Sequence, residues 1–390
     1  STSSKLSCSA RTVSGAPLSR NGSTRICPPC SPASATSGNG TTTTTATRLL
    51  INPQGVGHIL TVPYFSTQGN NKTLLSITNT DTTNGKAVKL RFRGAANSDD
   101  IFDITVFLSP GDVWTADVAA DGDISRLVTN DTSCTLPSAQ DIKDLGGKFK
   151  TNRVQGAAAA QTREGYVEIL NTADIPVNTA AGSLYTAIKH VGGKAPCTAA
   201  VMDAQATELA NAADAATRGY AHPTGQLMAN WILVNVDGMA SHSGEAVAVR
   251  AVNAAGANAA GNIVWFPQTT DAPTAGAVNT LTADPLLQSA GFAAEVANYD
   301  FPDLSTPYLA APAAGAPETQ AVTLANQLAV RSVVNEYATS NGFSTDWVFS
   351  MPTRRYAVAV DCAGKELEFN SGVVAHFTAG NTSLNATTLQ

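Results

Sequence analysis

Two cysteines three positions apart are the first candidates for chemistry in this sequence. Cys27 and Cys30 bracket Pro28 and Pro29 in the stretch ICPPCSP. A redox-active Cys-x-x-Cys needs its first thiol at a helix N-terminus within a strand–helix–strand unit, and no such pattern surrounds this pair. Covalent haem attachment needs a histidine after the second cysteine, whereas residue 31 is serine. We therefore expect neither redox catalysis nor haem binding here.

The two prolines instead favour disulfides to other cysteines. Pro29 drives Pro28 towards polyproline II, which would place the two cysteine Cα atoms about 9 Å apart, beyond the roughly 7 Å that a disulfide spans. Each thiol should pair outward, within this chain or with another chain, with free or metal-bound thiols as the alternative. An even cysteine count is typical of disulfides in an oxidising compartment. We expect all six in disulfides of undetermined pairing: Cys8, Cys27, Cys30, Cys134, Cys197 and Cys362.

The stretch MASHSGEA is the nearest approach to a hydrolase motif. Ser241 and His242 are adjacent, so on a strand their side chains would point to opposite faces. The sequence has no G-x-S-x-G nucleophile elbow. A turn before the strand AVAVRAV explains these residues, and we expect no catalytic residue and no enzyme activity.

Metal ligands are not clustered along the chain. The acidic stretch DVAADGDISR, with Asp117, Asp121 and Asp123, resembles half of a calcium loop, but Val128 stands where a bidentate glutamate would be needed. The histidines are isolated from one another, so we expect surface or capped side chains, no metal site and no cofactor. They are His58, His190, His222, His242 and His376.

Composition limits the classes of partner. The 390-residue chain has a net charge of −6 and only 14% charged residues. A nucleic-acid binder would need clustered Lys and Arg, so nucleic acid is an unexpected partner. No apolar run approaches the roughly 18 residues that span a bilayer. Abundant Thr and Asn, few Lys and the even cysteine count favour an extracellular or cell-surface location, with any export signal removed.

The first 47 residues form a Ser/Thr/Pro-rich arm that cannot bury a core of its own. Threonine is β-branched and fits a sheet, so TTTTTATRLLI can enter an edge that receives it, in this chain or in a neighbour. The residues that we expect at such a subunit interface are Thr41, Thr42, Thr43, Thr44, Thr45, Leu49 and Leu50.

Residues 48–140 show the period-two alternation of strands with one buried face. In KAVKLRFRG, Val88, Leu90 and Phe92 point one way, while Lys89, Arg91 and Arg93 point the other. We expect the basic stripe to be a solvated face, with an acidic polymer or a neighbouring subunit as alternative contacts. Short strands at this spacing predict one or two antiparallel β-sandwiches, immunoglobulin-like in type.

Residues 141–390 are expected to form a second β-rich domain with helical insertions. Strand patterns include GYVEIL, NWILVNV and RRYAVAV, and helices are predicted at 199–217 and 319–339. Residues 267–318 look like a long ordered loop. The four tryptophans lie in apolar strand contexts, which favours core packing over a sugar-stacking platform. They are Trp114, Trp231, Trp265 and Trp347.

Three stretches carry a resemblance to a known family. They are LLINPQGVGHILTVPYFSTQGNNKTLLSITNTD, VKLRFRGAANSDDIFDITVFLSPGDVWTADV and VVNEYAT with TDWVFSMPTRRYAV. Over residues 48 to about 362, the chain resembles exported, largely uncharacterised β-rich cell-surface proteins of Gram-negative bacteria. The resemblance implies secretion and a β-rich fold, but no reaction.

The sequence as a whole predicts a secreted structural subunit. An arm strand donated to a neighbour's sheet would satisfy a row of backbone hydrogen bonds, and head-to-tail donation would build a filament or surface array as a homopolymer. Disulfides would reinforce the joint. The alternative is an extracellular β-sandwich that binds carbohydrate, with surface glycans as partners.

Overall fold

The computed structural model describes residues 45–95, 100–151, 159–206 and 212–263, the strands at 358–361 and 366–369, and residues 328, 348, 350 and 352. Several predictions concern residues outside these ranges. They are the disulfides of Cys8, Cys27, Cys30 and Cys362, the interface roles of Thr41, Thr42, Thr43 and Thr44, most of the helix at 319–339, the loop at 267–318, and the positions of Trp265, Trp347 and His376.

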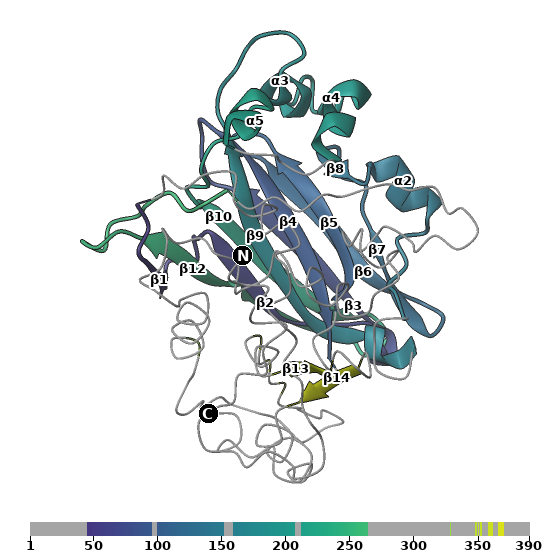
Figure 1. Cartoon of the computed structure of the whole chain (residues 1–390). Coiled ribbons are helices and arrows are strands. Elements are labelled where there is room, and N and C mark those ends of the chain that lie inside the picture. The colour runs from purple at the N-terminus through teal and green to yellow at the C-terminus, as the bar shows by residue number, and fades with distance from the viewer. Residues whose placement is uncertain are drawn as a thin grey trace.

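Two antiparallel sheets pack face to face in the described part of the chain (Figure 1). The larger sheet has the order β1 (Arg48–Ile51), β12 (Val247–Val252), β2 (Ile59–Ser66), β9 (Glu164–Ile175), β4 (Gly85–Gly94), β5 (Asp100–Leu108) and β8 (Cys134–Leu136). The smaller has the order β11 (Ala240–Glu245), β10 (Leu227–Asn235), β3 (Asn71–Asn79), β6 (Val113–Asp121) and β7 (Ile124–Val128). A separate hairpin joins β13 (Val358–Asp361) to β14 (Glu366–Phe369). The mainly β prediction is confirmed, whereas the immunoglobulin-like type is not.

The main core lies between the two sheets. Val88, Leu90 and Phe92 of β4 are fully buried there, as their alternation predicts. Trp114 and Trp231 reach the same core from the smaller sheet, so these two tryptophans pack as predicted. An aromatic cluster closes one end, where the ring centroids of Phe92 and Phe149 are 5.0 Å apart, and those of Phe102 and Phe149 4.9 Å.

Strands from both sides of residue 140 build the same two sheets. β9 lies between β2 and β4, and β10 pairs with β3. The expected boundary between 48–140 and 141–390 therefore does not separate one sheet from another. That boundary was predicted from local composition, which does not determine how strands far apart in the sequence pair.

Short helices cover one end of the larger sheet's outer face (Figure 1). Three of them, α3 (Leu184–Ile188), α4 (Ala199–Asp203) and α5 (Ala212–Thr217), gather there, and α2 (Ala139–Asp144) lies near β8. The helix predicted at 199–217 is found as α4, a 3-10 turn at Ala204–Ala206 and α5, with residues 207–211 outside the description. Further 3-10 turns occupy Gln68–Asn70 and Ala159–Thr162.

A disulfide joins Cys134 of β8 to Cys197, with the two Cα atoms 5.3 Å apart. The predicted disulfide role of these two cysteines is confirmed. Their sulfurs lie with Leu136, Ala187 and Met202 in the core beneath the helices. The bond therefore fastens the segment that carries α3 and α4 to the edge of the larger sheet.

Replacing this disulfide should lower the stability of the fold. The bond closes a loop with a sequence separation of 63 residues, for which chain entropy predicts a loss of about 4 kcal/mol. We expect Cys134→Ala, Cys197→Ala and the double variant to lose similar free energies of unfolding in urea, because either single change breaks the bond. An unchanged unfolding midpoint in all three would contradict this role.

Candidate functional sites: a buried ionic cluster and a surface groove

The basic stripe on β4 is buried, which corrects the expectation of a solvated face. Lys89, Arg91 and Arg93 are each at most 1% exposed. The predicted alternation is right, but β4 is a central strand and both of its faces are covered. A charged strand face is exposed to solvent only where no other part of the chain packs against it. The sequence pattern is the same for an exposed and for a covered face.

Carboxylates from the two neighbouring strands neutralise this stripe. Lys89 Nζ lies 2.7 Å from Asp103 Oδ1, and Arg91 Nη2 lies 3.5 Å from Asp103 Oδ2, on β5. Arg93 Nε lies 3.0 Å from Glu168 Oε2 on β9. Both carboxylates are as deeply buried as their partners. Ions removed from water remain charged only when paired in this way.

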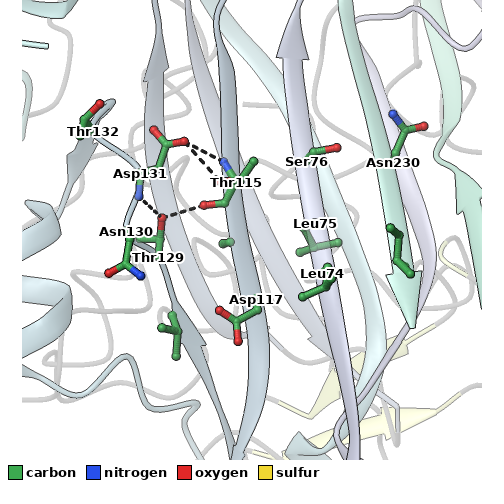
Figure 2. Close-up of a pocket in the computed structure, with 13 residues that line it drawn as sticks. Leu74, Leu75, Ser76, Thr115, Asp117, Thr129, Asn130, Asp131, Thr132 and Asn230 are labelled. Carbon is green, nitrogen blue, oxygen red and sulfur yellow. Dashed lines mark hydrogen bonds between the residues drawn. The ribbon is translucent and has the colours of Figure 1, made fainter. Parts of the chain in front are cut away.

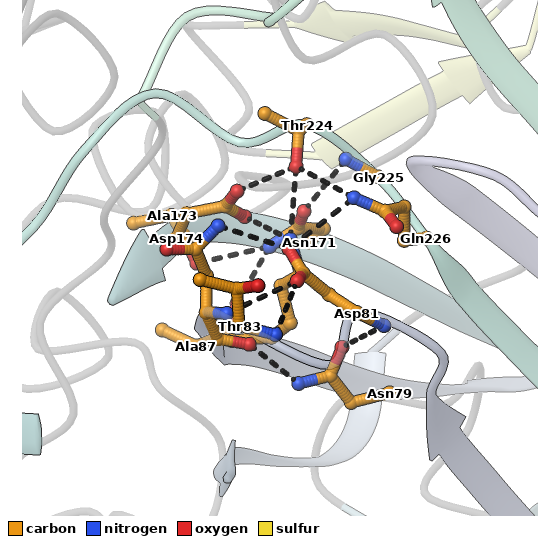
Figure 3. Close-up of polar contacts among 12 residues, drawn as sticks. Asn79, Asp81, Thr83, Ala87, Asn171, Ala173, Asp174, Thr224, Gly225 and Gln226 are labelled. Atoms are coloured by element: carbon orange, nitrogen blue, oxygen red, sulfur yellow. Dashed lines mark hydrogen bonds and ion pairs between the residues drawn. The ribbon is translucent and has the colours of Figure 1, made fainter. Parts of the chain in front are cut away.

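A second ionic cluster brings together Asp81, Asp174 and Thr224 (Figure 3). All three contact Lys86, at the start of β4. Lys86 has no exposed surface, and its Nζ donates hydrogen bonds to Asp81 Oδ2 at 3.1 Å and to Thr224 Oγ1 at 2.9 Å. Nζ also lies 2.7 Å from Asp174 Oδ1 on β9. The Thr224 hydroxyl in turn donates to Asp174 Oδ2 at 2.6 Å. One cation thus faces two carboxylates.

The two carboxyl groups of this cluster differ in environment. Burial acts to raise the pKa of Asp81, but backbone hydrogen bonds from Asn84 and Thr83 outweigh it and lower that pKa to about 2. Burial dominates for Asp174 and raises its pKa, although Lys86 and Thr224 act in the opposite direction. Paired acids with opposed pKa shifts are typical of proton-transfer sites. Asp81 is therefore the anion of the cluster, and Asp174 is the group closer to a neutral acid.

His58 lies next to this cluster and is fully buried, contrary to the surface or capped position expected for it. Its Nδ1 accepts a hydrogen bond from the Ala251 backbone at 3.1 Å. Gly225 packs directly against the ring, where a Cβ atom would lie 2.6 Å from Nδ1. Burial, followed by the positive charge of Lys86, lowers the pKa of His58 to about 4. This histidine is neutral at physiological pH.

The sequence did not single out Lys86, Asp81, Asp174 or Thr224 as site residues. They come from a turn, two strands and a loop that meet only in the folded chain. One signal was present: DTTNGK places an aspartate close before Lys86, at the start of β4. No local pattern points to Asp174.

A shallow groove of about 600 Å³ lies on the outer face of the smaller sheet (Figure 2). Two cross-strand rows form its floor. Asn230, Ser76 and Thr115 pair across β10, β3 and β6, and the next row begins with Ile232 and Leu74. Polar groups therefore lie beside an aliphatic strip that is about 40% exposed, at 37% for Leu74 and 40% for Ile232.

The loop after β7 forms one wall of the groove (Figure 2). The Asp131 carboxylate holds this loop in place by accepting a hydrogen bond from Thr115 N at 3.0 Å, and Thr129 Oγ1 donates to Thr115 O at 2.7 Å. Asp117 on the floor pairs with Lys72 at 2.9 Å. Since the residues that line the groove include two aspartates but neither Lys nor Arg, the groove suits a neutral ligand better than an anion.

A group of Ser109, Asp112 and His190 has the composition of a hydrolytic triad but not its geometry. Ser109 Oγ and Asp112 Oδ2 both contact His190 Nδ1, at 3.1 and 3.3 Å. A triad histidine contacts the nucleophile through one ring nitrogen and the carboxylate through the other. The Nε2 atom faces Thr132 Oγ1 at 3.4 Å, and that hydroxyl donates to Gly193 O. The ring therefore joins two loops.

Other predicted site residues are placed as follows. Ser241 and His242 lie in β11, an exposed edge strand, which corrects the expectation of a turn. Asp121 pairs with Ile124 around a tight turn at Gly122, and its carboxylate contacts Lys148 at 3.2 Å. The half calcium loop is thus a hairpin between β6 and β7.

The N-terminal interface residues within the description are Thr45, Leu49 and Leu50. Thr45 is exposed and precedes β1. Leu49 and Leu50 pair with Ala251 and Arg250 of β12 in the same chain. Leu49 is 1% exposed and packs with Ile59 and Val249. The edge that receives this strand is therefore one of the chain's own.

The buried His58 predicts a loss of stability in mild acid. Its folded-state pKa of about 4 lies below the ordinary value of 6.5, so the unfolded chain takes up this proton first as pH falls. This difference contributes about 3 kcal/mol to the free energy of unfolding. The contribution is fully present above pH 6.5 and is lost as the pH falls to 4. We expect His58→Asn, which keeps an acceptor for Ala251, to flatten the pH dependence of the unfolding free energy between pH 7 and 4.5. Parallel curves for the two proteins would refute this assignment.

Comparison with known proteins gives no further guide to these sites. No protein-family model, curated protein or solved structure matches the chain. The resemblance to exported cell-surface proteins therefore stays a prediction, and the case for function depends on the side chains described above.

Proposed function

We propose that the chain is a secreted structural subunit that self-assembles through its N-terminal strand into a filament or surface array. The observation that carries this proposal is the position of β1. It is the first described strand, it follows the Ser/Thr-rich arm directly, and it forms the outer edge of the larger sheet.

The connectivity around β1 suits exchange between copies. β12 lies between β1 and β2 and is antiparallel to both, so β1 and β2 run parallel to each other. The strand between them comes from much later in the chain. The connection at 52–58 contains Pro53, Gly55 and Gly57. If β1 left its own β12 and paired with the β12 of a neighbouring subunit, it would form the same four residue pairs that it forms within its own chain.

The energetics of such an exchange depend on concentration. The contacts of Leu49 with Ile59 and Val249 would be reproduced in the neighbour, so the exchanged and closed forms have similar interaction energies. Domain exchange of this kind is a low-cost route to oligomers, and a head-to-tail arrangement does not close on itself. Open-ended exchange therefore yields fibres at high concentration.

Two properties support a location outside the cell. The Cys134–Cys197 disulfide is buried in a core where it holds the helices to the sheet, as expected of a bond made in an oxidising compartment. The low share of charged residues and the high Thr and Asn content fit the same location.

Assembly should depend on the burial of Leu49. We expect the full chain to form concentration-dependent oligomers in light scattering and fibres in negative-stain images. Leu49→Arg places a charge in a pocket that is 1% exposed in the closed and exchanged forms alike, so it favours a detached β1 over both, and the concentration needed for assembly should rise about tenfold. Val236→Arg, at a turn position that is 76% exposed, is the matched control and should assemble normally. A wild-type chain that stays monomeric at all concentrations would refute the proposal.

A second candidate function is carbohydrate binding, and the groove on the smaller sheet favours it. Sugars combine hydroxyl groups with apolar ring faces, and the floor sets the Asn230–Ser76–Thr115 row beside Ile232 and Leu74. Among the described residues, the Asn230 amide has no hydrogen-bond partner, so it is available to a ligand. Trp114 and Trp231 do not contribute, since both are buried.

Glycan binding in the groove can be tested with a neutral-glycan array followed by titration calorimetry. Asn230→Ala should weaken binding about fivefold, the loss expected for one hydrogen bond. Ser241→Ala, on the exposed edge strand β11, should leave affinity unchanged. Equal affinities for the wild type and Asn230→Ala, or no binding to any glycan, would exclude this second function.

A further inference from the structure

A buried amine and a buried carboxyl group meet across two neighbouring strands of the larger sheet. Lys86 of β4 and Asp174 of β9 are register partners, which brings their Cβ atoms to within about 5 Å. The register shifts next to this pair, between Ala87 and Val88, and Thr172 is the extra residue of β9. Bulges often re-aim a side chain near a site of chemistry. Here the result is a distance of 2.7 Å between Lys86 Nζ and Asp174 Oδ1.

This contact differs from an ordinary hydrogen-bonded ion pair. Asp174 Oδ1 accepts no hydrogen bond despite the short distance, because Nζ directs its hydrogen bonds to Asp81 Oδ2 and Thr224 Oγ1. The Lys89–Asp103 pair on the same strand is also 2.7 Å long, but it does have hydrogen-bond geometry, and Arg91 shares its carboxylate. Two of the three N–H bonds of Lys86 are thus directed to Asp81 and Thr224, and the nitrogen lies in direct contact with the Asp174 carboxyl group.

We propose that Lys86 Nζ and the Asp174 carboxyl group condense into an intramolecular isopeptide bond that joins β4 to β9. Nζ attacks Asp174 Cγ, a carbon–nitrogen bond forms, and the Oδ2 oxygen leaves. An ammonium and a carboxylate give one amide and one water, so atoms and charge balance with no oxidant, reductant or cofactor. Oδ1 becomes the amide oxygen.

The cluster supplies the protonation states that condensation needs. One proton passes from Nζ through the Thr224 hydroxyl to Asp174 Oδ2, which converts the ion pair into an amine and a carboxylic acid. In a buried site, neutral partners are favoured over separated charges. Burial raises the pKa of Asp174, in agreement with this direction of transfer.

Asp81 and Thr224 have distinct parts in the reaction. Asp81 Oδ2, 3.1 Å from Nζ, accepts the second proton as the nitrogen attacks. Hydrogen bonds from Thr83 N, Asn84 N and Gln226 Nε2 keep Asp81 an anion until then. The Thr224 hydroxyl donates to Asp174 Oδ2 and so lies where the leaving oxygen must be protonated. The proton held by Asp81 replaces it, which completes the water.

Position alone accounts for much of the rate. Groups fixed in reactive contact behave as if at effective concentrations on the order of 10⁵ M or more. Both Lys86 and Asp174 are buried, at 0% and 2% exposed, so bulk water does not compete with the amine. The reaction needs no enzyme and follows folding.

Peptide mass spectrometry of the purified wild-type chain tests the bond directly. Trypsin does not cleave after an acylated lysine, so we expect residues 73–89 joined to residues 164–189, with a mass lower than the sum of the two peptides by one water. Neither peptide contains cysteine, so disulfides do not affect the result. Fragmentation should place the link at Lys86 and Asp174. Separate peptides 73–86 and 164–189, after prolonged incubation of the folded protein, would overturn the proposal.

Variants separate the roles of the participants. Asp174→Ala removes the acceptor carbon and should abolish the link. Asp81→Asn keeps the shape but not the base, and it should leave most of the chain unlinked while circular dichroism shows the same strand content. Asp117→Asn, which breaks an exposed ion pair with Lys72, is the matched control and should stay fully linked. Full linkage in Asp81→Asn would overturn the role of Asp81 as proton acceptor. Light scattering measures assembly separately, so either proposal can fail without the other.

Discussion

The buried cations of β4 constrain the rest of this structure. Lys86, Lys89, Arg91 and Arg93 are all buried, and the penalty for burying one ion is several kcal/mol unless a partner neutralises it. For Lys89, Arg91 and Arg93, the neutralising carboxylates come from the two strands beside β4. The identity of those neighbours is therefore fixed as much by charge as by hydrophobic contact.

This requirement explains why the chain forms one pair of sheets. β5 follows β4 directly and supplies Asp103, but the other neighbour must come from further along the chain, and β9 supplies Glu168 and Asp174. A different strand in that place would take Glu168 away from Arg93 and Asp174 away from Lys86. Hydrophobic residues on the inner face favour a sandwich in general, whereas the buried ion pairs select one strand order.

Period two in the sequence predicted the strands and the residues that share a face. It placed Val88, Leu90 and Phe92 in the core correctly. It did not predict that the Lys89 face is buried, because burial of that face depends on strands far away in the sequence. The cluster at Lys86 combines residues 81, 86, 174 and 224, and no local spacing relates them. The same limit applies to Cys134 and Cys197, whose role was predictable but whose pairing was not.

The two ionic groups on β4, one around Asp103 and one around Lys86, contain similar residues but differ in the ratio of cations to carboxylates. Asp103 lies between two cations, Lys89 and Arg91, which stabilise its negative charge. Around Lys86 the balance is reversed, since two carboxylates compete for a single cation, and hydrogen bonds assign the negative charge to Asp81. Asp174 is then the carboxyl group with the least support for its charge. An excess of acid over base in a buried site is thus what distinguishes the proposed reactive pair from a stabilising one.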